Sequence, residues 1–280
     1  MVVWDPPIRD YQFLYHELLP AIETVQRLGY TDFDADFLDS LIEGWATHCE
    51  EVWLPINLVG DRKGLKFEDG KITMPQEFKD AYRQGIDEGW LSTTCEPEHG
   101  GMGVPLFFQA VTWAEFGTSA CMALSVLPAL SIGVYEVLVK HGRQDLIDYF
   151  ATNLASGEWS GTMCLTEPHA GTDLGIIETK AIPQDDGTYR LSGSKCFITY
   201  GEHDMAENIV HLVLAKAPGG PEGTKGISLF LVPKFLSEDW QSGGLEGISH
   251  SLTSEHNGVT CSGTEEKMGL HASPTCVMNL

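Results

Sequence analysis

Residues 163–173, which read Met-Cys-Leu-Thr-Glu-Pro-His-Ala-Gly-Thr-Asp, carry the densest chemistry in the chain. An apolar run ends there in a Glu-Pro turn, and a Gly-Thr pair follows at once. Such a turn can direct backbone N–H groups and the hydroxyls of Thr166 and Thr172 at one anionic or polar ligand. Gly171 can supply the positive φ that lets backbone approach a phosphate. By itself the segment is also consistent with a strand that ends in a structural turn.

A second segment supplies the groups that the first one lacks. Residues 195–201 read Lys-Cys-Phe-Ile-Thr-Tyr-Gly, with the aromatic ring of Phe197 two positions before the hydroxyl of Thr199. An aromatic face and a hydroxyl on neighbouring backbone suit a flat heteroaromatic cofactor. We therefore interpret the two segments together as the two halves of a cofactor site.

Other catalytic motifs are missing from the sequence. His169 lies close to Glu167 and Asp173, but their spacing matches no recognised metal site, so we predict no metal ion. Gly157-Glu-Trp-Ser-Gly161 has the wrong spacing for a nucleophile elbow. Residues 100–103 lack the third glycine of a dinucleotide fingerprint, and no phosphate-binding P-loop occurs.

Composition indicates a globular protein with room for two domains, since 42% of the 280 residues are hydrophobic. The net charge of −23 repels phosphate backbones and anionic lipid, so we expect no nucleic-acid partner. The seven cysteines form no Cys-x-x-Cys pair and no targeting leader is evident, which favours a reducing, cytoplasmic location.

The uncharged stretch 116–135 is long enough for a membrane span, but its Gly, Ser, Thr and Pro residues favour a buried core helix or helix pair.

The spacing of apolar residues along the chain changes near residue 158. Up to that point apolar residues recur at helical spacing, interrupted by a predicted exposed loop at 61–75, after which we expect a helix to start at Thr73. From Trp159 onward, short apolar runs alternate with turn residues, which is typical of an antiparallel sheet or small barrel. The sequence therefore predicts an α+β protein with an α-helical domain (1–158) followed by a β domain (159–280).

These residues carry a resemblance to a known family. Residues 164–173 resemble the flavin-binding signature of the acyl-CoA dehydrogenase family, Thr-Glu-Pro-x-Ala-Gly-Ser/Thr-Asp. Residues 193–199, Gly-Ser-Lys-Cys-Phe-Ile-Thr, resemble the family's Gly-x-Lys-x-Phe/Trp-Ile-Thr/Ser strand. Further likeness at 201–215 and 226–234 resembles a subgroup of long bacterial members. The order of domains also resembles that of the family and covers most of the chain.

The resemblance implies an FAD site built from both motifs. The backbone at Met163 and Leu165 and the hydroxyl of Thr166 would bond the pyrimidine edge of the flavin. Gly171 and Thr172 would lie at the pyrophosphate, with Thr172 also near the pantetheine arm of a CoA thioester. From the second motif the implied flavin contacts are the ring of Phe197, the strand at Ile198, and the hydroxyl of Thr199 near N5. Met163 and Phe197 replace the family's frequent Tyr and Trp, and both remain apolar.

The resemblance also implies the reaction. Family members oxidise an acyl-CoA to the trans-2-enoyl-CoA and pass the electrons to an electron-transfer flavoprotein. Their general base is a Glu on a C-terminal helical bundle, which we expect beyond residue 280, so we name no catalytic residue. Family members form homodimers or homotetramers. The alternatives are an acyl-CoA oxidase, which would keep the fold, and a non-catalytic flavin- or acyl-CoA-binding protein.

Overall fold

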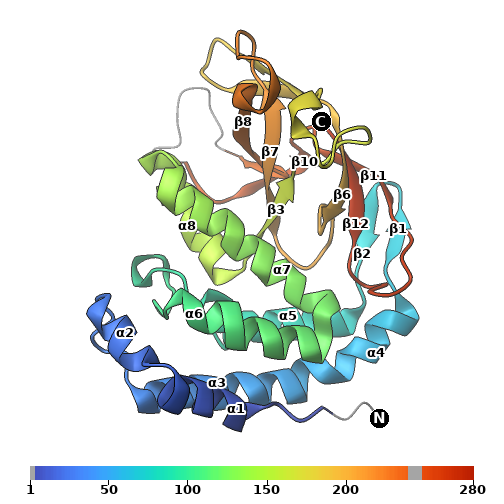
Figure 1. Cartoon of the computed structure of the whole chain (residues 1–280). Coiled ribbons are helices and arrows are strands. Elements are labelled where there is room, and N and C mark those ends of the chain that lie inside the picture. The colour runs from blue at the N-terminus through green and yellow to red at the C-terminus, as the bar shows by residue number, and fades with distance from the viewer. Residues whose placement is uncertain (1–3, 239–247) are drawn as a thin grey trace.

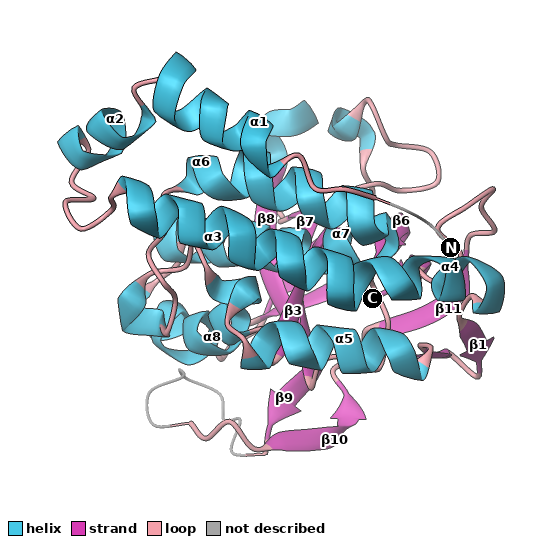
Figure 2. Cartoon of the chain, turned by 90° about the horizontal axis from the view of Figure 1, so that it is seen from below, coloured by secondary structure: helices cyan, strands magenta, loops and turns pink. Residues whose placement is uncertain are grey.

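The computed structural model describes residues 4–238 and 248–280. Helices fill the chain up to Ser156, and strands dominate from Trp159 onward. Figure 1 shows a helical layer on one side and the strands on the other, with α7 and α8 between them. Figure 2 shows the same helices covering the strands from below. The predicted α+β architecture is confirmed.

The first helices form an outer layer whose starts and breaks follow the sequence. Asp34 caps α3 by accepting a hydrogen bond from the amide of Phe37 at 2.8 Å, as expected of an Asp at a helix start. Single π-helical turns interrupt the helical run twice. The elements are α1 (Ile8–Phe13), η1 (Leu14–Leu18), α2 (Ala21–Arg27), α3 (Ala35–His48), η2 (Cys49–Trp53) and α4 (Leu54–Lys63).

The predicted exposed loop at 61–75 is wrong in part, because the chain forms a small hairpin there. Strands β1 (Lys66–Glu68) and β2 (Lys71–Thr73) pair in antiparallel register around Asp69 and Gly70. Both turn residues have positive φ, 50° and 78°, as a type I′ turn requires. The next helix, α5 (Gln76–Asp87), begins after Pro75 rather than at Thr73.

The apolar stretch becomes the core helix α7 (Ala114–His141). It is interrupted at Cys121, whose φ of −152° and ψ of 86° are not helical, and Pro128 lies inside its second part. The helical run Leu106–His141 is long and apolar enough to cross a membrane, yet 56% of its most apolar window is buried inside the protein, as in core helices of soluble proteins. The neighbouring elements are η3 (Trp90–Ser92), η4 (Pro97–His99), α6 (Leu106–Phe108), η5 (Gln109–Trp113) and α8 (Gln144–Ser156).

The strands form mixed sheets, and no closed barrel is seen among the described residues. The predicted antiparallel sheet is corrected in one respect: β3 (Trp159–Cys164) pairs in parallel with β7 (Asn208–Lys216). This arises because residues 165–207 cross over and return the chain in the same direction. The five-stranded sheet is completed by β4 (Lys180–Pro183), β5 (Tyr189–Ser192) and β8 (Ile227–Pro233). A three-stranded sheet consists of β6 (Ser194–Thr199), β11 (Thr260–Thr264) and β12 (Thr275–Asn279), and β9 (Phe235–Ser237) pairs with β10 (Leu252–His256). Two short helical turns are η6 (Leu174–Ile176) and η7 (Gly223–Gly226).

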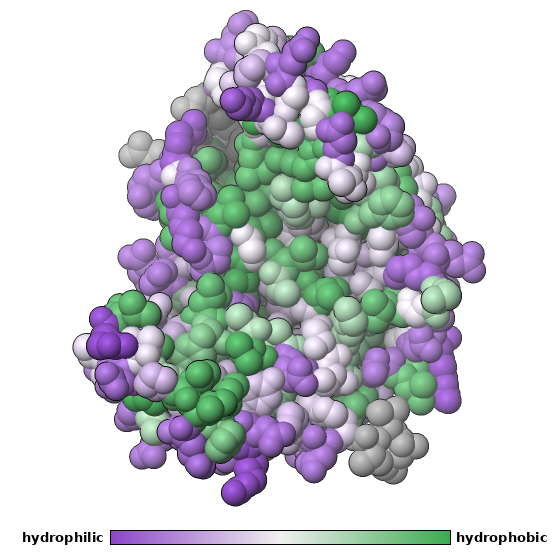
Figure 3. All heavy atoms as spheres, in the orientation of Figure 1, coloured by the Kyte–Doolittle hydropathy of each residue, from purple (hydrophilic) through white to green (hydrophobic). Residues whose placement is uncertain are grey.

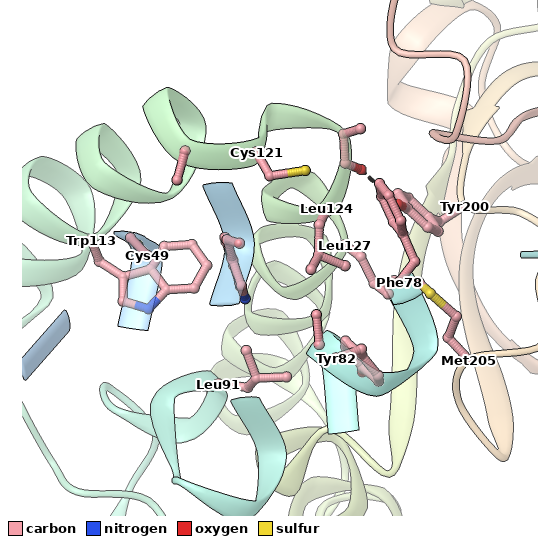
Figure 4. Packing of buried hydrophobic residues seen from close by; sticks show 14 of the residues in the cluster. Cys49, Phe78, Tyr82, Leu91, Trp113, Cys121, Leu124, Leu127, Tyr200 and Met205 are labelled. Carbon is pink, nitrogen blue, oxygen red and sulfur yellow. Dashed lines mark hydrogen bonds between the residues drawn. The ribbon is translucent and has the colours of Figure 1, made fainter. Parts of the chain in front are cut away.

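The helical and β regions share one continuous core. Figure 3 shows apolar residues across the middle of the face seen in Figure 1. Gly161 of β3 lets α7 approach closely, since a Cβ there would lie 2.6 Å from the side chain of Val134. Tyr200 reaches from the end of β6 to the broken part of α7, where its hydroxyl donates to the carbonyl of Ala123 near Cys121 (Figure 4). The strand that carries the second motif is thus fixed against the uncharged stretch of α7.

Candidate functional site

The chain leaves the sheet at the end of β3 with free hydrogen-bonding groups. Leu165 and Thr166 follow the last paired residue of β3 and are half-buried. In residues 4–238 and 248–280, neither their two amides nor the hydroxyl of Thr166 donates to a protein acceptor. Partly buried donors without protein partners are available to a ligand, because burying them unpaired is unfavourable.

A tight turn follows, and its carboxylate is fully engaged. Glu167 and Ala170 exchange backbone hydrogen bonds of 2.9 and 3.0 Å. The buried Glu167 carboxylate accepts from the amide of Glu178 at 2.7 Å, from the amide and hydroxyl of Thr179, and from Lys195 Nζ at 2.9 Å. Although burial alone would raise the pKa of Glu167, these hydrogen bonds lower it to about 2. Glu167 is therefore a structural anion that holds the turn.

Lys195 joins the two sequence motifs. Its side chain is fully buried, and Nζ donates to the Glu167 carboxylate and, at 3.1 Å, to the carbonyl of Leu165. The amide of the next residue, Cys196, donates to the carbonyl of Thr166 at 2.9 Å. The end of β3 and the start of β6 are therefore locked side by side.

Phe197 sits at an irregular position of β6. The pairing of β6 with β12 shifts between Lys195 and Ile198, which leaves an extra residue in β6, as in a β-bulge. Phe197 has a φ of 60°, rare for a bulky side chain, and is 59% exposed, whereas Ile198 is buried. The bulge thus presents an aromatic ring at the surface next to Thr199, whose hydroxyl has no protein partner in the described part of the chain. Strained backbone of this kind concentrates at ligand sites.

Comparison with known proteins shows the family to which the chain belongs. Residues 65–158 match the model of the acyl-CoA dehydrogenase N-terminal domain, and residues 162–280 match that of the acyl-CoA dehydrogenase middle domain. The chain belongs to the acyl-CoA dehydrogenase family.

Individual members of the acyl-CoA dehydrogenase family show how much of the protein this chain represents. It is 41% identical to the 3-methylmercaptopropionyl-CoA dehydrogenase of Ruegeria pomeroyi over 99% of the chain and 45% of that relative. It is 35% identical to a butyryl-CoA dehydrogenase of Syntrophomonas wolfei over 96% of the chain and 43% of that relative. The chain thus spans less than half the length of these curated relatives.

Solved structures agree on the fold. The acyl-CoA dehydrogenase of Bacillus anthracis, solved in complex with FAD, superposes with a TM-score of 0.67 at 23% identity and covers 89% of this chain and 36% of its own. At this identity the likeness shows the fold alone.

The structure brings most of the predicted site residues of this family member together. Met163, Leu165 and Thr166 lie at the end of β3, beside the part of β6 that carries Phe197, Ile198 and Thr199. Ile198 is buried, so only its backbone can face a ligand there. Thr172 is exposed in the loop after the turn.

One prediction about the turn is wrong. Gly171 does not adopt a positive φ. A Cβ there would make only ordinary contact, 3.6 Å from Thr166 Cγ2. The Glu167–Ala170 backbone pairing already forms the turn, so the chain needs no left-handed residue at Gly171.

The Glu167–Lys195 pair, which joins the two motifs, is not predicted by the sequence pattern. A signal was available, because a lysine inside an otherwise apolar strand pattern must either reach solvent or find a buried anion. Its partner could not be chosen from the sequence, since many acidic residues are available.

A groove of about 750 Å³ lies beside the turn. It is lined by the Pro168–His169 corner, by residues 177–180 and 192–194, and by Lys216. Glu167 lines it as well, whereas Thr166, Phe197 and Thr199 do not. The free donors and the exposed ring therefore lie outside this groove.

Proposed function

We propose that the full-length protein is an FAD-dependent acyl-CoA dehydrogenase that converts an acyl-CoA into the trans-2-enoyl-CoA. The observation that carries this proposal is that the partnerless donors of Leu165 and Thr166 follow β3 where the chain is hydrogen-bonded to β6, the strand that carries the exposed Phe197 ring and the Thr199 hydroxyl. FAD, when bound, supplies the two-electron acceptor. The FAD complex of the related Bacillus anthracis enzyme supports this choice of cofactor.

The residues present fit a flavin in chemistry. Two amides and a hydroxyl at the end of β3 can donate to the electron-rich pyrimidine edge of the ring, and Phe197 offers an apolar face for stacking. Thr199 adds a hydroxyl on the neighbouring strand. These groups bind and orient, and we assign none of them the removal of a proton from the substrate.

The rest of the proposal follows the family resemblance. Electrons would pass to an electron-transfer flavoprotein, and the protein would work as a cytoplasmic homo-oligomer. Thr172, exposed in the loop after the turn, would contact the CoA thioester as well as the cofactor.

The test uses the full-length protein. We expect it to copurify with a flavin that absorbs near 450 nm and that bleaches, without air, on addition of a suitable acyl-CoA. A panel that includes butyryl-CoA and 3-methylmercaptopropionyl-CoA follows the substrates named for the relatives. Absence of flavin, or no bleaching with any acyl-CoA, would reject the proposal.

The same preparation separates the alternative activity. If reduced protein is reoxidised by oxygen with formation of peroxide, the protein is an acyl-CoA oxidase. If it is reoxidised only by an electron-transfer flavoprotein or an artificial one-electron acceptor, it is a dehydrogenase.

A further inference from the structure

Lys195 holds the only positive charge that the described structure records against the carbonyls at the end of β3. Its Nζ donates to the carbonyl of Leu165 at 3.1 Å, and its side chain is fully buried. The peptide unit that contains this carbonyl also contains the amide N–H of Thr166. A hydrogen bond from a cation to a peptide carbonyl polarises the peptide, so that its N–H becomes a stronger donor.

That N–H is one of the donors without a protein partner among the described residues. We infer that Lys195 acts through the Leu165–Thr166 peptide as a positioning residue that strengthens the donor offered to the flavin and raises the reduction potential of the bound cofactor. Reduction adds negative charge to the ring, and a positive charge near its pyrimidine edge favours the reduced form. This inference rests on the flavin site of the proposed function.

The counter-charge of Lys195 is the Glu167 carboxylate, which accepts from Nζ at 2.9 Å. Glu167 takes its remaining hydrogen bonds from Glu178 and Thr179, whereas Lys195 bonds the carbonyl of Leu165 directly. Both side chains of the ion pair are almost inaccessible to water, at 0% and 3% exposure, so their charges are weakly screened. A change in either charge should therefore be felt at the end of β3, with opposite sign.

A purely structural role of the Lys195–Glu167 pair would give different results in the two charge variants. If the pair only held the two motifs together, removal of either partner would loosen the turn in the same way. Both variants would then lose cofactor or would leave its potential unchanged. The sign of the potential shift thus separates electrostatic action from simple bracing.

The experiment compares three variants of the full-length flavin-loaded protein by reductive titration against a dye of known potential. Lys195→Met removes the positive charge and should make the midpoint potential more negative by about 30 mV or more, which is a tenfold change for a two-electron couple. Glu167→Gln removes the negative charge and should make it more positive. Thr179→Val removes one hydrogen bond to Glu167 without changing any charge, and should leave the potential unchanged.

Each outcome decides the inference. The inference is supported if the midpoint potential becomes more negative in Lys195→Met and more positive in Glu167→Gln. If only one of these two variants retains flavin, a shift of its expected sign supports the inference. Equal potentials in all forms overturn it, as do shifts of the same sign in both charge variants. Loss of flavin from both, with retention in Thr179→Val, also overturns it and leaves only a structural role for the pair. A wild-type protein that binds no flavin would instead reject the proposed function.

Discussion

The hydroxyl of Tyr200 donates to the carbonyl of Ala123 at 2.6 Å, joining the end of β6 to the broken segment of α7. Tyr200 is fully buried and has a positive φ of 54°. The position of the strand that bears Phe197 and Thr199 is therefore fixed by the core helix α7 as well as by its sheet.

Replacement of Tyr200 by Phe tests the weight of this contact. We expect a loss of about 1 kcal/mol in the free energy of unfolding, the usual net worth of one hydrogen bond, measured by urea denaturation. Tyr189→Phe is the matched control, since Tyr189 is 45% exposed and its hydroxyl has no protein partner within the described residues. Equal stability of both variants would mean that the Tyr200 bond contributes nothing.

Removal of the candidate flavin-binding hydroxyls should weaken cofactor retention. Thr166→Val and Thr199→Val each delete one donor while keeping the size of the side chain, and each should raise the flavin dissociation constant about three- to tenfold. Thr260→Val, in an exposed position on β11, serves as control. Unchanged flavin content in both site variants would refute their placement at the cofactor.

Phe197→Gly should separate stability from binding. Glycine adopts a φ of 60° without strain, and the left-handed backbone costs a bulky residue about 1–2 kcal/mol. Because the Phe197 ring is mostly exposed, we expect the flavin-free protein to remain as stable as wild type or to become more stable. Flavin affinity should fall, since the stacking ring is gone. Thermal unfolding without cofactor and flavin titration measure the two effects, and a variant that binds flavin as tightly as wild type contradicts the role of the ring.

Gly193→Ala should disturb Thr179, which donates a hydrogen bond to Glu167 of the Lys195–Glu167 pair. A Cβ at Gly193 would lie 2.9 Å from Thr179 Cα and closer still to its hydroxyl, so the hydroxyl that donates to Glu167 must shift. We expect a loss of about 1–3 kcal/mol in the free energy of unfolding, as for other overpacked sites. Gly133→Ala is the control: nothing lies within 4 Å of that position in α7, so alanine should stabilise the helix by about 0.5–1 kcal/mol. Destabilisation by both would point to a general intolerance of alanine.

Two buried histidines, each hydrogen-bonded to a hydroxyl of β3, predict an acid-sensitive fold. Burial, aided by the charge of Lys234, lowers the pKa of both His203 and His211 to about 3. Unfolded histidine titrates near pH 6.5, so between about pH 6.5 and 3 the unfolded chain binds more protons. Stability should therefore be full above pH 6.5 and fall as the pH drops through this window. Burial also lowers the pKa of His48, despite its bond to Glu88, which acts in the same direction.

The measurement is the urea midpoint at half-unit steps from pH 7.5 to 4.5. The buried Glu167 should contribute little there, because its destabilising protonation begins only near the ordinary carboxylate pKa, about 4.3. His211→Gln should flatten the profile, since it removes one of the groups whose protonation opposes folding. A wild-type midpoint that does not change across this range would contradict the assignment of neutral, buried imidazoles.

Local features were the part that sequence could predict. The lack of charged residues over 116–135 predicted the core helix, and the spacing of Phe197 and Thr199 predicted one side of the candidate site. What escaped prediction depends on contacts distant in the chain. The parallel pairing of β3 with β7, the bulge at Phe197 and the Lys195–Glu167 bond are all fixed by partners that local pattern does not name.

The parallel pairing of β3 with β7 also bears on the order of folding. The chain from Leu165 to Thr199, with every candidate flavin contact except Met163, lies inside the connection between those two strands. Such long-range closures form late, because the entropy of the connection must be lost before its contacts are gained. As the chain emerges from the ribosome, the helical layer can be complete while the cofactor site is still open. Free flavin in the cell would then act after the helical layer has formed, by trapping chains whose β7 has docked.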